Sequence, residues 1–306
     1  MIAMRDIEAA AGRLAGVSVR TPLLQNHALD EEVGGKVLVK PECLQVTGSF
    51  KIRGAYNFLS QLTPEEAAKG VVAFSSGNHA QGVAAAGSLL GIKTAIVMPE
   101  DAPRAKLENT RRLGGEVITY DRYTGDREAL ARQIAAERGA VVVPSYDHDF
   151  IIAGQGTVGL EIAEQCAEFG TEPDHVLVCC GGGGLIAGSA TALKARWPNV
   201  SVHPVEPEGF DDTARSLLSG QRESIDESAR SICDALQAHS PGRLTFEINQ
   251  RLLDTGLVVS DDEVRQAIRF AFRNLKLVAE PGGAVALAAV LAGKIDTQGK
   301  TTVVVI

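Results

Sequence analysis

The chain contains 306 residues, a length that corresponds to about two domains, each with a buried core of its own. Its net charge is −8 and no Lys/Arg block could follow a phosphate backbone, which argues against a nucleic-acid partner. The apolar runs are too short to span a bilayer, and the N-terminus lacks the apolar region of a signal peptide. Five cysteines, an odd number, favour a reducing compartment. We therefore expect a soluble, cytoplasmic protein without a nucleic-acid or membrane partner.

Alternating strand and helix patterns begin after a helix start at Thr63, where a glutamate three residues later completes a capping box. The predicted strands are 71–74, 94–98, 116–120 and 140–143, and the predicted helices between them are 81–90, 104–113 and 126–138. Gly91, Gly114 and Gly139 follow these helices as C-terminal stops. Strands that alternate with helices predict a parallel sheet with right-handed crossovers.

A second α/β pattern occupies the rest of the chain. Its predicted elements are a helix over 154–169, a strand over 176–180, a helix after the glycines at 181–184, strands over 200–205 and 301–306, and a capped helix that starts at Ser260. The fold class expected from both patterns is α/β, with two open, mostly parallel twisted sheets flanked by helices. No linker stands out between the two units, so we expect them to pack closely and to leave a ligand-binding cleft between them.

Four consecutive glycines, Gly181 to Gly184, stand between a predicted strand and a predicted helix. The backbone N–H groups at such a junction, together with the helix dipole, favour a bound phosphate. A flexible turn is the alternative, but four glycines are entropically costly for a simple connection. A dinucleotide site also stays open, because Glu206 ends the next strand, near the position where an acidic residue would bind a ribose. A P-loop is excluded, because no Gly-Lys-Ser/Thr sequence follows the glycines.

Two further segments contain candidate reactive groups. Ser75-Ser76-Gly77-Asn78-His79 lies at the carboxyl end of a predicted parallel strand, where its N–H groups and polar side chains suit a substrate carboxylate; a plain helix cap is the alternative. Lys51 lies between Phe50 and small residues, and burial in such a setting lowers the pKa of a lysine, although a solvated lysine is the default interpretation. A lysine, a polar loop and a phosphate cradle together indicate pyridoxal phosphate.

The three segments, in this order and spacing, resemble the fold-type II pyridoxal-phosphate enzymes, specifically the serine/threonine dehydratase and serine racemase family. The matching sequences are Thr-Gly-Ser-Phe-Lys-Ile-Arg-Gly-Ala at 47–55, Ser-Ser-Gly-Asn-His-Ala-Gln-Gly at 75–82, the four glycines, Pro-Ser-Tyr-Asp at 144–147, Gly-Gln-Gly-Thr at 154–157 and Glu-Pro-Gly-Gly-Ala at 280–284. The resemblance implies a tryptophan synthase β-like fold. It also implies a large cofactor-binding domain of residues 1–52 and 148–306, a small domain of residues 53–147, and an active site in the cleft between them.

The resemblance also implies site residues. Catalytic roles are implied for Lys51, which binds the cofactor covalently and takes the Cα proton, and for Ser76, the candidate second acid/base. The implied cofactor contacts are Phe50, Lys51, Asn78, Gly181, Gly182, Gly183, Gly184 and Leu185, and the implied substrate contacts are Ser75, Ser76, Asn78 and His79. A site for Mg²⁺ or Ca²⁺ is implied at the Glu206 and Asp212 carboxylates and the Phe210 carbonyl, because oxygen ligands suit such hard ions. An acidic surface turn is the alternative there.

The implied function is that of a pyridoxal-phosphate-dependent dehydratase, an ammonia-lyase that converts a β-hydroxy amino acid such as L-threonine or L-serine to a 2-oxo acid and ammonia. The alternatives are a 3-hydroxyaspartate dehydratase or a serine racemase within the family, and a nucleotide-binding α/β protein outside it. A homodimer is implied as well. One departure concerns the Ser, Thr or Cys that the family places after the last strand to bind the pyridine nitrogen. The chain ends at Ile306, so we expect either that the natural chain continues or that the ring is held differently.

Overall fold

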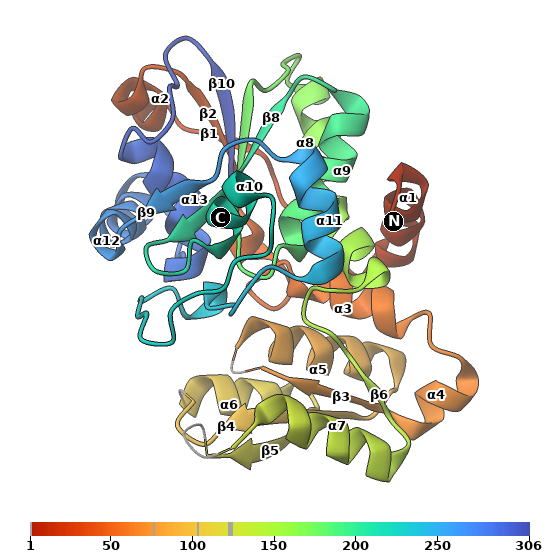
Figure 1. Cartoon of the computed structure of the whole chain (residues 1–306). Helices are drawn as coiled ribbons and strands as arrows, with labels where there is room; N and C mark the ends of the chain where they lie inside the picture. The colour runs from red at the N-terminus through yellow and green to blue at the C-terminus, as the bar shows by residue number, and fades with distance from the viewer. Residues whose placement is uncertain (1, 76, 103, 122–124) are drawn as a thin grey trace.

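The structure is a computed structural model that describes residues 2–75, 77–102, 104–121 and 125–306. It contains two sheets, one above the other in the view of Figure 1. The larger sheet has the strand order β1 (Leu24–Gln25), β2 (Lys36–Lys40), β10 (Thr301–Val305), β7 (His175–Cys179), β8 (Ser201–Pro207) and β9 (Leu257–Val259). The smaller sheet has the order β5 (Glu116–Tyr120), β4 (Thr94–Pro99), β3 (Val71–Phe74) and β6 (Val141–Val142). Of the described strand pairs, β1 with β2 is antiparallel and the others are parallel, so the predicted α/β class with mostly parallel sheets is confirmed.

Side chains of the smaller sheet alternate between two layers of helices, as the two-residue period of a strand requires. The helices of this unit are α3 (Lys51–Leu59), α4 (Pro64–Lys69), α5 (Asn78–Leu90), α6 (Arg104–Arg112) and α7 (Arg127–Arg138). Ala73 and Ile96 point to one face, where they pack in a core with α3 and α5. Val72 and Val97 point to the other face and pack with α7. Both faces are therefore covered, and the carboxyl edge of the sheet stays accessible to a ligand.

The larger sheet is also covered on both faces and forms the largest apolar core. Its helices are α1 (Met4–Leu14), α2 (His27–Val33), α8 (Asp149–Glu168), α9 (Gly184–Arg196), α10 (Asp212–Ser219), α11 (Arg243–Leu252), α12 (Asp261–Phe270) and α13 (Pro281–Leu291), with short helical turns η1 (Glu42–Leu44), η2 (Asp234–Leu236) and η3 (Ala271–Leu275). Helices α8 and α9 cross so closely that a Cβ at Gly188 would overlap the Ile152 carbonyl oxygen. None of the described helices is both long and apolar enough to span a bilayer.

The predicted element boundaries agree with the structure to within a few residues, and the differences have local causes. The helix expected from residue 154 already begins at Asp149, because His148 Nδ1 accepts a hydrogen bond from the Phe150 N–H at 3.1 Å. Both capping boxes, at Thr63 and at Ser260, are confirmed. The expected helix stops are confirmed by left-handed φ angles at Gly91 (68°), Gly114 (90°) and Gly139 (62°).

The predicted domain limits follow the division between the two sheets. All four strands of the smaller sheet lie within residues 53–147, and all six strands of the larger sheet lie outside that range. Helix α3 crosses the expected limit, since it begins at Lys51 and packs against both α5 and α8. The limits at 52/53 and 147/148 therefore stay a prediction, with α3 shared by the two units.

Candidate active site

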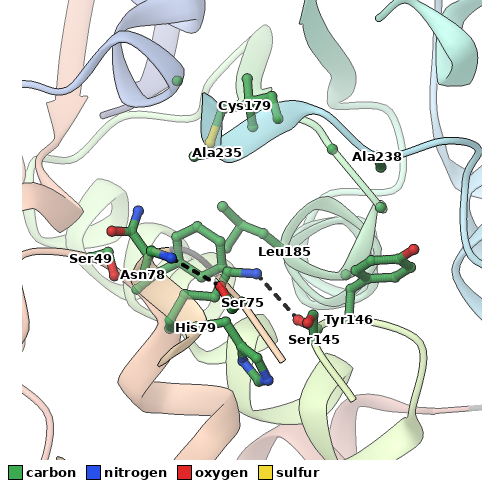
Figure 2. A pocket seen from close by; sticks show the side chains of 18 of the residues that line it. Ser49, Ser75, Asn78, His79, Ser145, Tyr146, Cys179, Leu185, Ala235 and Ala238 are labelled. Atoms are coloured by element: carbon green, nitrogen blue, oxygen red, sulfur yellow. Dashed lines mark hydrogen bonds between the residues drawn. The ribbon is translucent and has the colours of Figure 1, made fainter. Parts of the chain in front are cut away.

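A cavity of about 1040 Å³ opens between the two sheets, at the carboxyl ends of their parallel strands. The smaller sheet contributes the segment that follows β3, and the larger sheet contributes the glycine segment that follows β7. Figure 2 shows Ser75, Asn78 and His79 on one side of this cavity and Cys179 and Ala235 across from them. Ligands of open α/β sheets bind at this edge, because the strand-to-helix loops there expose their backbone N–H groups.

Lys51 is the first residue of α3, and its amine points into the cavity. Its Nζ atom donates a hydrogen bond to the Ser145 carbonyl oxygen at 3.2 Å and lies 5.0 Å from the centre of the Phe50 ring. A dashed line marks the hydrogen bond at Ser145 in Figure 2. Burial lowers the pKa of Lys51 from 10.5 to about 8, because removing water penalises the ammonium. At this pKa roughly one tenth of the amine is neutral at pH 7, and the neutral form is the one that attacks an aldehyde.

The glycine segment forms the turn that leads into α9. Gly183 adopts a left-handed φ of 89° at the N-cap position, so the first N–H groups of α9 receive no side-chain cap. The ring of Tyr146 lies directly on Gly182, where an added Cβ would overlap three ring atoms. Thr245 Oγ1 donates a hydrogen bond of 2.7 Å to the Gly182 carbonyl oxygen and thereby holds the turn from outside. The turn therefore keeps the uncapped N–H groups of α9 available, which fits the predicted phosphate site.

The polar segment after β3 leads into α5 in a similar way. The Gly77 N–H donates to Ser75 Oγ at 3.2 Å, and α5 begins at the next residue, Asn78. His79 is buried with its Nε2 atom 3.3 Å from the Val143 carbonyl oxygen. Burial, with a smaller contribution from the charge of Lys51, lowers the pKa of His79 to about 3, so its imidazole is neutral. Ser76, the predicted second acid/base, lies outside the described residues.

The structure brings the predicted cofactor and substrate residues around this one cavity. Its lining includes Phe50, Lys51, Ser75, Asn78, His79, Gly181, Gly182, Gly183, Gly184 and Leu185. The three predicted metal-site residues are not part of this lining. Which role each lining residue performs stays a prediction, because no bound molecule defines it.

Sequence reasoning did not assign roles to two further cavity residues. Glu280 faces the cavity from the N-cap of α13, and its Oε1 atom accepts a hydrogen bond from Asn78 Nδ2. The segment that starts at Glu280 is one of those that match the family, so a signal for it was present in the sequence. Cys179 ends β7 beside the cavity. Burial raises the pKa of this thiol to about 12, so it stays protonated and is a weak nucleophile.

The acidic segment that begins at the end of β8 contains the buried residues Glu206, Phe210 and Asp212, which lie outside the lining of this cavity. The Glu206 carboxylate accepts the Thr213 N–H at 2.9 Å and the Ala214 N–H at 2.7 Å. Asp212 is buried, and neither of its carboxylate oxygens has a hydrogen-bond partner in the part of the chain that the structure describes. Burial, followed by repulsion from Asp212, raises the pKa of Glu206 to about 8. An oxygen-binding cation would give the unpaired Asp212 carboxylate a partner, so this residue fits the predicted Mg²⁺ or Ca²⁺. Both Glu206 oxygens already accept backbone N–H groups.

The site just described is consistent with what comparisons with known proteins show. A family model described as "Pyridoxal-phosphate dependent enzyme" matches residues 15–306. The chain is 42% identical over 301 residues to an L-threo-3-hydroxyaspartate ammonia-lyase from Pseudomonas sp, an alignment that covers 98% of this chain and 93% of that protein. It is 40% identical over 301 residues to a serine racemase from Schizosaccharomyces pombe, with 98% and 92% coverage. Its structure resembles the crystal structure of a threonine deaminase from T.th. with a TM-score of 0.94 and 42% identity, over 99% of this chain and 97% of that one. The chain therefore belongs to the pyridoxal-phosphate-dependent enzymes of fold type II.

Proposed function

We propose that the protein is an ammonia-lyase that converts a β-hydroxy amino acid, such as L-threonine or L-serine, to a 2-oxo acid and ammonia. The observation that carries the proposal is the half-buried amine of Lys51, which faces the same cavity as the uncapped glycine turn at the start of α9. A neutral amine and a phosphate cradle are the two features that pyridoxal phosphate requires of a protein. The names of the relatives, a threonine deaminase among them, support the same class of reaction.

The residues of the cavity have distinct tasks in this proposal. Gly183 and Gly184 present backbone N–H groups to the cofactor phosphate, and Asn78 contacts the ring hydroxyl. When bound, pyridoxal phosphate supplies an electron sink for the pair left at Cα. Lys51 Nζ takes the Cα proton, while Ser75 and the first turn of α5 hold the substrate carboxylate.

The atoms of the proposed reaction balance without an oxidant. The Cα–H and Cβ–O bonds break, and one molecule of water leaves. One molecule of water then enters when the C–N bond is hydrolysed, so the products are the 2-oxo acid and ammonia.

Two other activities within the family are alternative proposals. Similarity to an L-threo-3-hydroxyaspartate ammonia-lyase supports 3-hydroxyaspartate as a substrate, and similarity to a serine racemase supports racemisation. Racemisation needs an acid/base on the face opposite Lys51, and Ser76 is the residue proposed for that role. The nucleotide-binding alternative has no comparable support, because the family match identifies pyridoxal phosphate as the cofactor.

The first experiment is an absorbance spectrum of the protein reconstituted with pyridoxal phosphate. It is followed by 2-oxo acid formation from L-serine, L-threonine and 3-hydroxyaspartate, and by measurement of D-serine formed from L-serine. We expect a visible band and oxo-acid release that both disappear in Lys51→Ala but persist in Lys93→Ala, an exposed lysine outside the cavity. Oxo-acid release that survives Lys51→Ala would contradict the proposal. A D-serine yield above the oxo-acid yield would instead select the racemase.

We also propose that Mg²⁺ or Ca²⁺ binds between Glu206, Asp212 and the Phe210 carbonyl. The unpaired, buried carboxylate of Asp212 supports this proposal. Each cation should raise the thermal midpoint of the wild type, because a ligand that binds the folded state stabilises it. The increase should vanish in Asp212→Asn and persist in Asp262→Asn, whose side chain is 84% exposed. An equal increase in both variants would exclude this site.

We also propose the predicted domain limits, a homodimer and a cytoplasmic location. The separation of the strands into two sheets supports domains of residues 1–52 with 148–306 and of residues 53–147. Light scattering on the eluting protein tests the homodimer, since a mass near 32.2 kDa would contradict it and twice that mass would support it.

A further inference from the structure

A hydrogen bond crosses the cavity and joins the two units of the fold. Asn78 is the first residue of α5, beside the smaller sheet, and Glu280 is the N-cap residue of α13, beside the larger sheet (Figure 1). The two residues are 202 positions apart in sequence, and Asn78 Nδ2 donates to Glu280 Oε1. Both side chains line the cavity in which we place the cofactor.

Glu280 is held by a rigid backbone. Pro281 follows it at the first position of α13 and restricts the chain there. The Glu280 carbonyl oxygen accepts the Gly283 N–H at 3.0 Å and the Ala284 N–H at 3.1 Å, so the backbone at Glu280 is fixed by the helix. The charged groups that act on its carboxylate are Lys51, Lys106 and Asp234, from three different elements. The acceptor therefore has a defined position on the far wall of the cavity.

This hydrogen bond decides which way the Asn78 amide faces. A carboxylate accepts hydrogen bonds, so Glu280 selects the orientation in which Nδ2 faces it and Oδ1 faces away. The second hydrogen of Nδ2 remains to donate to another group in the cavity. Without Glu280 the amide can rotate by half a turn, which would bring a carbonyl oxygen against the oxygen of the cofactor ring. Two acceptors facing each other repel, so the contact would be lost.

We propose that Glu280 is a positioning residue, which orients the Asn78 amide toward the cofactor ring. The proposal rests on the proposed function, because the ring contact of Asn78 is part of it. Glu280 itself needs no contact with the substrate. Its effect passes through Asn78, and this makes a definite prediction for a double-mutant cycle.

The experiment measures the dissociation constant of pyridoxal phosphate and the visible spectrum for the wild type, one control variant and five variants of Asn78 and Glu280. These are Glu280→Ala, Glu280→Asp, Glu280→Gln, Asn78→Ala and the double variant Asn78→Ala/Glu280→Ala. Leaving one partner of a buried hydrogen bond unpaired typically corresponds to about a tenfold or larger loss. We therefore expect Glu280→Ala to weaken cofactor binding at least about tenfold and to shift the absorbance maximum. The double variant should bind no more weakly than Asn78→Ala, because the two losses share one interaction.

Glu280→Gln and Glu280→Asp distinguish the contributions of side-chain length and charge at this position from an effect on folding. Glu280→Gln keeps an acceptor oxygen at the same distance, so it should bind the cofactor within about threefold of wild type. Glu280→Asp keeps the charge but shortens the side chain by one methylene group, so it should behave like Glu280→Ala. Glu65→Gln is the control, since this glutamate lies on α4 with a side chain 80% exposed. The two conservative variants decide the question even if Glu280→Ala does not fold.

Several outcomes would overturn the inference. Additive losses in the double variant would show that Glu280 acts independently of Asn78. Wild-type affinity in Glu280→Asp, or a Glu280→Gln as weak as Glu280→Ala, would show that reach and acceptor geometry are unimportant. These results differ from a failure of the proposed function, which would appear in the wild type itself as the absence of a visible band that depends on Lys51.

Discussion

Replacing Arg53 by methionine should destabilise the fold strongly, because Arg53 neutralises two carboxylates in the interior. Its guanidinium donates to both oxygens of Glu42, each at 2.8 Å, and to both oxygens of Glu161 at 2.6 and 3.0 Å. Arg53, Glu42 and the second cation Lys40 are at most 1% exposed. The Lys40 amine reaches Glu161 at 2.6 Å, and no ion pair joins it to Glu42 among the described residues. Without Arg53, the Glu42 carboxylate therefore stays buried without a bonded cation.

The expected loss is about 3–5 kcal/mol of unfolding free energy, the usual cost of leaving a buried charge unpaired. In thermal unfolding of the apo-protein this corresponds to a midpoint lowered by about 5–8 °C. Arg132→Met is the matched control, since its ion pair with Glu128 joins side chains that are 71% and 51% exposed. An exposed pair of this kind contributes at most about 1 kcal/mol.

The pH dependence gives this prediction a second test. Burial opposes ionisation of Glu42, but the charge and hydrogen bonds of Arg53 outweigh it, and the net pKa of Glu42 is lowered from 4.5. A carboxyl group whose pKa is lower in the folded state than in the unfolded state stabilises the fold at any pH above its unfolded-state pKa. This stabilisation is lost as the pH falls through the folded-state pKa. The difference between wild type and Arg53→Met should therefore shrink below about pH 4.5. A loss below about 1 kcal/mol at neutral pH, or no difference from Arg132→Met, would refute the reasoning.

Three further predictions concern the Lys51 amine, a helix crossing and the cavity mouth. The rate of cofactor uptake by the apo-protein, measured by stopped-flow absorbance, should rise with pH and level off above about pH 8, because burial lowers the pKa of Lys51 to about 8. A rate that continues to increase toward pH 10.5 would contradict this prediction. Gly188→Ala should lower the unfolding free energy by about 3 kcal/mol or more, because its Cβ would overlap the Ile152 carbonyl oxygen. Gly12 lies in α1, and a Cβ added there would have no neighbour within 4 Å. Gly12→Ala should therefore raise the unfolding free energy by about 0.5–1 kcal/mol, with both glycine variants measured by urea titration. Lys106→Ala removes the 2.5 Å ion pair with Asp234. It should weaken cofactor binding about two- to fivefold at low salt and less in 1 M NaCl, because salt screens the charges. Equal effects at both salt concentrations would exclude an electrostatic origin.

Much of the fold was predictable because its signals are local. The helix stop at Gly91 and the capping box at Thr63 depend on residues within one turn of the chain. The strand at 71–74 agrees with the structure residue for residue, since its apolar pattern is short and continuous. The short strands β1, β2 and β9 were not predicted. Their apolar runs are brief, and β2 becomes a central strand through its pairing with β10 near the other end of the chain.

The properties of the candidate site also divide into those that the local sequence determined and those that only the tertiary structure decided. The sequence by itself determined that Lys51, the Ser75–His79 segment and the glycines at 181–184 were candidates for one cofactor, because each has a local composition suited to a chemical task. Only the tertiary structure decided that they share one cavity and that Glu280 faces Asn78 across it. It also decided that the amine of Lys51 is buried enough to lose its proton readily. Such properties depend on which elements pack together and how much water they exclude, and no local pattern of residues encodes either quantity.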